Sequence, residues 1–157
     1  MIKNNVTRLL ESRGIDFEAF ELPNEKLSGI EAASYLGVEP ELVYKTIVVK
    51  RQNRGIPVLV LVPAPNEVDL KALSRALGEK KVYLATLKEA EQITGLQTGG
   101  ISPLALLNRR FQVIIDCAVQ SRKKIFISGG QRGINILLAT EDLVSMTNAS
   151  IASISRG

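Results

Sequence analysis

Two long apolar segments, "ELVYKTIVVK" at 41–50 and "IPVLVLVPA" at 56–64, constrain the fold more than any other part of the chain. Both are rich in valine and isoleucine, whose branched side chains favour strands, and the polar segment "RQNRG" separates them. This pattern predicts a β-hairpin whose turn lies in the polar segment. The rest of the core must therefore be built around a sheet.

Helical and strand patterns flank the hairpin on both sides. Amphipathic periodicity, capping residues and terminal glycines predict helices at 4–14, 29–37, 69–78, 86–95 and 140–146. Short apolar runs bounded by polar or turn residues predict strands at 16–22, 111–116, 124–128, 134–139 and 149–154. We therefore expect one α+β domain over residues 1–157, with a mixed, largely antiparallel sheet packed by helices.

The composition removes several kinds of chemistry. The chain has no histidine, which excludes Ser-His-Asp and Cys-His nucleophile systems, and its single cysteine leaves no ligand set for zinc. No apolar run approaches the roughly 20 residues of a membrane span, and the first residues do not form a secretory signal. We expect a cytoplasmic protein without a metal or other cofactor, whose chemistry depends on lysine, carboxylates, hydroxyls or backbone amides.

The basic residues form clusters. The net charge is +4, and basic clusters lie at 50–54, 79–82, 108–110 and 121–124. A single cluster of this kind is usually a solvated turn, but four in one chain also suit contacts with nucleic-acid phosphates. The absence of tryptophan and the few other aromatic residues argue against a stacking platform for single strands.

The segment "QTGGISPLALL" at 97–107 is the first candidate site. Gly99 and Gly100 permit a positive φ and allow a ligand to approach the backbone N–H groups, while Pro103 stiffens the segment after its open part. Such N–H groups can hold an anion or a developing oxyanion. A tight connection between a helix and the sheet explains the same residues, and the segment alone does not decide between the two interpretations.

Lys45 and a second glycine cluster, "SGGQRG" at 128–133, are further candidates. Strict alternation places Lys45 on the same face of its strand as Val43, Ile47 and Val49. A lysine in that position either extends from a sheet edge into solvent or lies in a cavity. The second glycine cluster lies between two predicted strands, and a hairpin turn alone explains it.

Taken together, "VYKT", "DLKALSRALG" followed by "KKV", "TGGISPL", "ID" at 115–116 and "SGGQRG" resemble, in order and spacing, the YbaK-like aminoacyl-tRNA deacylases. These are relatives of the editing domain of bacterial prolyl-tRNA synthetases. The resemblance covers nearly the whole chain and implies a strongly twisted mixed sheet with flanking helices. It also implies trans-editing hydrolysis of Cys-tRNA(Pro), with the mischarged proline tRNA as substrate and prolyl-tRNA synthetase as a candidate partner.

The resemblance also implies the site residues. It assigns catalysis to Lys45 and to the backbone N–H groups of Gly100 and Ile101, which would face the ester carbonyl. Water or the substrate's own thiol would be the nucleophile. It assigns substrate binding to the remaining matched positions, which are Thr46, Gly99, Ser102, Pro103, Ser128, Gly129, Gly130 and Asn135.

This chain departs from the family pattern at two positions. Asn135 stands where an acid is usual, and Ser28 stands where an aromatic residue is frequent. Both departures bear on amino-acid specificity. Two alternatives therefore remain open, namely an Ala-tRNA(Pro) deacylase of the same family and a non-catalytic RNA-binding or regulatory module.

Overall fold

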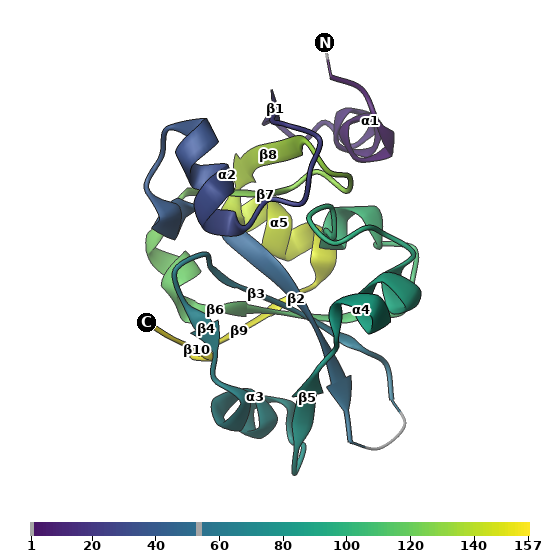
Figure 1. The fold of residues 1–157 in the computed structure, drawn as a ribbon, viewed down its shortest axis with the longest axis vertical. Coiled ribbons are helices and arrows are strands. Elements are labelled where there is room, and N and C mark those ends of the chain that lie inside the picture. The colour runs from purple at the N-terminus through teal and green to yellow at the C-terminus, as the bar shows by residue number, and fades with distance from the viewer. Residues whose placement is uncertain (1, 53–54) are drawn as a thin grey trace.

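The computed structural model describes residues 2–52 and 55–157 and contains five α-helices in this part of the chain (Figure 1). The helices are α1 (Asn5–Ser12), α2 (Gly29–Leu36), α3 (Leu70–Leu77), α4 (Leu87–Thr94) and α5 (Thr140–Thr147). The strands are β1 (Phe17–Glu21), β2 (Tyr44–Arg51), β3 (Val58–Pro63), β4 (Glu67–Val68), β5 (Val82–Leu84), β6 (Gln112–Asp116), β7 (Lys124–Ser128), β8 (Ile134–Ala139), β9 (Ser150–Ala152) and β10 (Ser155–Arg156). Every helix and long strand expected from the sequence is present.

Three sheets organise the strands. The largest has the order β5-β2-β3-β6-β9, and smaller sheets have the orders β1-β8-β7 and β10-β4. The predicted hairpin is the antiparallel β2–β3 pair, in which Lys45 lies opposite Val62. Its predicted turn includes residues 53–54, which lie outside the described residues. Only the β3–β6 and β6–β9 pairs are parallel among the strands described, so the predicted α+β class with a mixed, largely antiparallel sheet is confirmed.

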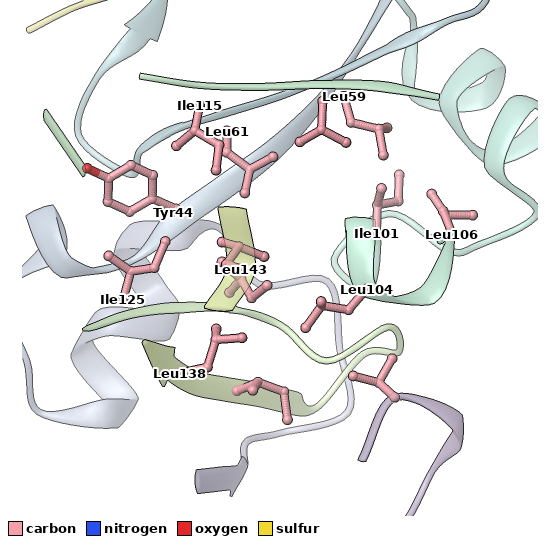
Figure 2. Close-up of a cluster of buried hydrophobic side chains, with 14 of the residues drawn as sticks. Tyr44, Leu59, Leu61, Ile101, Leu104, Leu106, Ile115, Ile125, Leu138 and Leu143 are labelled. Atoms are coloured by element: carbon pink, nitrogen blue, oxygen red, sulfur yellow. The ribbon is translucent and has the colours of Figure 1, made fainter. Parts of the chain in front are cut away.

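Strand β3 is buried on both faces and separates two parts of the core. Leu59 and Leu61 belong to the larger hydrophobic cluster, which fills the space between the five-stranded and three-stranded sheets. Figure 2 shows these two leucines beside Tyr44, Ile115 and Leu143. The valines at the alternating positions of β3 point to the other face and pack with Leu73 of α3 in a second hydrophobic cluster. These valines are Val58, Val60 and Val62. This two-sided burial explains why the β3 sequence is continuously apolar.

Local sequence signals begin and end the helices as expected. Thr86 and Glu89 form a capping box at the start of α4. Asp69 accepts a hydrogen bond from the N–H of Ala72 and begins α3, while Gly78 ends that helix with a φ of 69°. These caps satisfy backbone groups that the helix itself leaves unpaired, which is why they locate the helix ends from sequence alone.

The edge of β2 that faces away from β3 is covered at its two ends only. Strand β5 pairs with Val49–Arg51, and the N–H of Ala85 donates to the carbonyl of Val48. At the other end, Val43 forms an isolated bridge with Phe126 of β7. Between these contacts, residues 44–47 have no strand partner on this edge among the described residues. The resulting gap positions the candidate site.

No helix in the part of the chain that the structure describes is both long and apolar enough to cross a membrane.

Candidate active site

A cavity of about 570 Å³ lies beside the open edge of β2. Its walls come from β2, the start of α2, the first glycine segment and the ends of β7 and β8. Six of the site residues expected from the sequence line it: Lys45, Thr46, Gly99, Ile101, Ser128 and Asn135. The fold therefore brings together residues that are separated by up to about 90 positions in the chain.

Lys45 is half-buried in the wall formed by β2. It shares a face of the strand with Ile47 and Val49, which pack in the second core cluster as the alternation predicts. Burial lowers the pKa of the Lys45 ammonium, and the negative charge of Glu67 partly opposes that effect. Of the two interpretations left open by the sequence, the structure supports a lysine committed to a cavity.

Gly99 lies in the wall opposite β2 and has a φ of +92°, in the region that favours glycine. The N–H of Thr98 donates to the Glu91 carboxylate at 2.8 Å, and this bond fixes the start of the turn. The N–H groups of Gly99 and Ile101 have no hydrogen-bond partner among the described residues. Both residues line the cavity, so two residues with uncommitted backbone donors lie in its wall.

Gly100 has a different role from its neighbour. Its N–H donates to the carbonyl of Gln97 at 2.8 Å, so this group is already used within the turn. Gly100 does not line the cavity, and its φ is not positive. A Cβ at this position would lie 2.7 Å from the Cα of Gln131 and 2.8 Å from the N of Arg132. The structure thus corrects the expected position of the Gly100 N–H and shows that close packing requires glycine here.

The second glycine cluster packs directly on the first. Arg132 donates from Nε to the carbonyl of Thr98 at 2.7 Å and from Nη2 to its hydroxyl at 3.3 Å. Asn4 begins α1 and also donates from Nδ2 to the carbonyl of Gly129 at 2.9 Å. The pattern had predicted a hairpin turn alone, whereas the structure shows a turn that also supports the cavity wall.

Three residues that line the cavity have a buried polar atom without a hydrogen-bond partner among the described residues. These atoms are Oη of Tyr44, Oγ1 of Thr46 and Oδ1 of Asn135. Asn135 lies opposite Ser128 in the β7–β8 pair, which places both residues at the same end of that hairpin. A buried polar atom without a partner is costly, and a bound polar ligand would remove that cost.

The remaining predicted site residues lie outside the cavity and have structural contacts. Ser102 is fully buried, and its Oγ accepts a hydrogen bond from the N–H of Leu104. Pro103 is buried at the start of the short helix that Ser102 caps. Gly129 and Gly130 form the second turn, where an added Cβ would lie 2.5 Å from Ile134 and 2.9 Å from Val6, respectively.

The cavity also contains residues that the sequence analysis did not identify. Lys26, Gly29 and Gly133 line it. A Cβ at Gly29 would lie 2.6 Å from the Cβ of Ala64, so this glycine lets the start of α2 approach the sheet. Gly133 has a φ of 85°, and its carbonyl accepts a hydrogen bond from the N–H of Leu22. The "RG" of the second glycine cluster was the available signal for Gly133, whereas Lys26 had none.

This arrangement can bind an anionic or ester-containing ligand. Lys45, which is half-buried, lines the cavity together with Gly99 and Ile101, whose backbone N–H groups have no partner among the described residues. Donors fixed before the reaction can stabilise negative charge that develops on a carbonyl oxygen. No cluster of His, Cys, Asp and Glu that could hold a metal ion occurs within residues 2–52 and 55–157. The site has the features of a hydrolase for an activated ester.

Comparisons with known proteins agree with this class. A model of the aminoacyl-tRNA editing domain matches residues 24–146. EbsC of Enterococcus faecalis, which is named as a Cys-tRNA(Pro)/Cys-tRNA(Cys) deacylase, is 34% identical over 154 residues, covering 97% of this chain and 93% of EbsC. The Ser/Thr-tRNA deacylase ProXp-y of Escherichia coli K12 is 25% identical, covering 99% of this chain and 97% of ProXp-y.

Comparison of the fold with solved structures finds relatives of the same class. A crystal structure described as a trans-editing enzyme for prolyl tRNA synthetase superposes with a TM-score of 0.83 and 25% identity, over the full length of both chains. The chain belongs to the aminoacyl-tRNA editing domain family. The predicted family, the editing fold and an aminoacyl-tRNA ester hydrolase are thereby confirmed, with tRNA as the class of substrate.

Proposed function

We propose that this protein is a trans-editing deacylase that hydrolyses Cys-tRNA(Pro) in the cytoplasm, where proline tRNA is charged. The activity for which EbsC is named and that of the structural relative support the cysteinyl group, the proline tRNA and a link to prolyl-tRNA synthetase. The observation on which the proposal chiefly depends is the cavity that joins Lys45 to the wall containing Gly99 and Ile101. All of residues 1–157 would act as one editing domain.

In this proposal, the ester carbonyl lies between the two walls of the cavity. The ammonium group of Lys45 holds the terminal nucleotide by charge and hydrogen bonding. The free N–H groups of Ile101 and Gly99 donate to the carbonyl oxygen as it becomes negative, while Gly100 fixes the turn that carries them. Removing one such donor typically lowers the rate about 10²–10³-fold.

Hydrolysis of this ester does not require a strong protein base. The nucleophile adds to the carbonyl carbon, the ester C–O bond breaks, and the ribose oxygen leaves and takes up a proton. Because an aminoacyl ester is activated, holding it in position beside oriented donors supplies much of the catalysis. A chain without histidine is therefore sufficient, and water or the cysteinyl thiol supplies the nucleophile.

The remaining assignments concern the aminoacyl group and the turn around it. Thr46, Ser128 and Asn135 surround the aminoacyl group and supply polar contacts, since two of them have unpartnered buried oxygens. Ser102, Pro103, Gly129 and Gly130 act indirectly by fixing the turn geometry. Asn135 is neutral, and we therefore expect it to recognise the substrate by hydrogen bonding.

A panel of mischarged tRNAs tests this function. The purified protein is incubated with proline tRNA carrying cysteine, alanine, serine or proline, and loss of the ester is measured over time. We expect the fastest hydrolysis with cysteine and the slowest with proline. Preference for alanine would support the alternative substrate, and no hydrolysis of any ester would leave only the RNA-binding module. If the thiol is the nucleophile, the serine and alanine esters will be stable.

A further inference from the structure

A second cavity of about 620 Å³ lies on the other side of Lys45. Lys45 and Ile47 belong to both cavities, so the two are adjacent across β2. The remaining walls of the second cavity come from β4, α3, β5 and β10. The active-site function proposed above uses Lys45 but does not use this cavity.

The second cavity is positively charged. Besides Lys45 it contains Lys71, Arg75 and Arg156, against the two carboxylates of Glu67 and Asp69. The first cavity contains as many acids as cations, namely Glu25 and Glu31 against Lys26 and Lys45. Of the two spaces that meet at Lys45, the second therefore suits a polyanion better.

The cations of the second cavity are available to a ligand. Lys71 and Arg75 are exposed and lie four residues apart on α3, a spacing that puts them on the same face of the helix. Arg156 is exposed and lies opposite Glu67 in the β4–β10 pair. None of these three side chains forms an ion pair or a hydrogen bond in the described part of the chain.

Three other basic residues of the molecule are already engaged. Lys50 pairs with Glu89, and Arg51 pairs with Glu79. Arg109 donates to the carbonyls of Thr94 and Ile93, which lie at the end of α4. The carboxylate of Asp69 already accepts a hydrogen bond from the backbone at the start of α3, which weakens its repulsion of a bound anion. The cations around the second cavity are thus distinguished by their position, since they lie together around one cavity and have no side-chain partner among the described residues.

The second cavity also has an apolar side. Ile47 and Leu84 line it, and the side chain of Leu84 is 49% exposed. An exposed leucine next to unpaired cations matches a ligand that has both charged and apolar surfaces. Single-stranded nucleic acid is such a ligand, since its phosphates alternate with flat bases.

We propose that the second cavity binds the single-stranded 3′ end of the tRNA, with Lys71, Arg75 and Arg156 contacting the phosphates that precede the terminal nucleotide. This inference rests on the function proposed above, because it places the ester at Lys45 and extends the RNA chain away from the first cavity. The bases contact Ile47 and Leu84. The cavity supplies affinity for tRNA and takes no part in breaking the ester bond.

The test removes the three charges together, in the variant Lys71→Gln/Arg75→Gln/Arg156→Gln. Two measurements are made on the whole protein. One is the affinity for a labelled single-stranded RNA ending in CCA, at several salt concentrations. The other compares hydrolysis of charged tRNA with hydrolysis of the same aminoacyl group on adenosine alone, which has no phosphate.

We expect weaker RNA binding and a flatter salt dependence, since each lost contact to a single strand lowers the slope of log affinity against log salt by about 0.7. Three lost contacts flatten it by about 2. The KM for charged tRNA should rise about 10-fold or more, while the rate on the adenosine ester stays that of the wild type.

Arg8→Gln is the matched control, because Arg8 is an exposed helical arginine on α1, at the opposite end of the molecule from α3 (Figure 1). A triple variant that binds RNA as Arg8→Gln does would overturn the inference. Equal losses of hydrolysis rate on charged tRNA and on the adenosine ester would also overturn it, because the three charges would then stabilise the fold or act in catalysis. If the wild type hydrolyses neither ester, the proposed function fails, while the RNA-binding measurement still tests the cavity.

Discussion

The two walls of the first cavity offer a substrate different kinds of chemical group. The strand wall uses side chains, because it presents the polar residues Lys45 and Thr46 to the cavity. The wall at 97–102 uses its backbone, because Gly99 and Gly100 have no side chains and two N–H groups have no partner in the described structure. Substitution on the strand wall should therefore affect activity alone, whereas substitution at Gly100 should affect stability and activity together.

The largest expected effect is that of Gly100→Ala. The new Cβ would lie 2.7 Å from the Cα of Gln131, and neither backbone can move without shifting a turn. We expect the free energy of unfolding to fall by about 3 kcal/mol, as for an overpacked core position. Displacement of the Ile101 N–H should lower kcat/KM of the folded protein about 100-fold. Denaturant titration and ester hydrolysis measure the two effects.

Gly14→Ala provides the control for this substitution. Gly14, unlike Gly100, has a positive φ, of 66°, and its Cβ would meet no atom within 4 Å. Gly14→Ala should lower the free energy of unfolding by about 1 kcal/mol through backbone strain and leave the activity unchanged. Wild-type stability and activity in Gly100→Ala would contradict the close packing of the two glycine turns.

Lys45→Met should lower activity without lowering stability. Methionine retains the apolar part of the side chain and removes the ammonium group, whose hydrogen bonds to a charged substrate are worth a factor of about 10 to 100. The pKa of Lys45 is lowered by burial, which means that the charge itself does not favour the folded state. The kcat/KM and the unfolding midpoint are measured together.

Lys124→Met is the control for Lys45→Met, since Lys124 is an exposed lysine on β7 outside both cavities. It should leave both quantities unchanged. Equal activity of Lys45→Met and the wild type would exclude the proposed role of Lys45 and leave the RNA-binding module as the better interpretation.

Ser102→Ala should have a smaller effect, and on stability alone. The N–H of Leu104 would lose its acceptor in a fully buried position, at a cost of about 1–2 kcal/mol. Because Ser102 does not line the cavity, kcat/KM should stay close to that of the wild type. Ser12→Ala, which removes an exposed hydroxyl on α1, serves as the control for thermal unfolding. A selective rise in KM would show that Ser102 contacts the substrate after all.

The smallest expected effect is that of Glu67→Gln, which should shift the pH dependence of the activity. The charge of Glu67 raises the pKa of Lys45, so its removal should lower that pKa further. Activity that needs the protonated ammonium is lost as the pH rises through this pKa, and the alkaline limb should therefore move to lower pH. The adenosine ester is the substrate to use, with exposed Glu18→Gln as the control. A shift to higher pH would contradict the assignment.

The sequence predicted what is determined by neighbouring residues. Asp69, Thr86 and Gly78 mark helix ends through contacts within about four positions, so their signals are local. The alternation around Lys45 correctly identified the face of β2. The family resemblance then assembled the cavity residues, six of which the structure brings together.

What the sequence did not predict depends on contacts between distant segments. Gly100 and Gln131 lie close together only because the connection after α4 meets the turn between β7 and β8, and no local pattern distinguishes the Gly100 N–H from that of Gly99. The short strands β4, β5 and β10 were also missed, since two or three residues are too few for a periodicity. The second cavity arises from the packing of α3 against β2, which the sequence does not specify at the level of single side chains.

Asn4 links the order of synthesis to the order of folding. Its side chain both begins α1 and holds the carbonyl of Gly129, so α1 cannot complete its anchoring while the chain beyond residue 129 is still inside the ribosome. We expect α1 to be among the last elements of this domain to dock. Helix α1 would then remain exposed while most of the domain is being made, when an unpaired apolar helix face is most open to aggregation or to a chaperone.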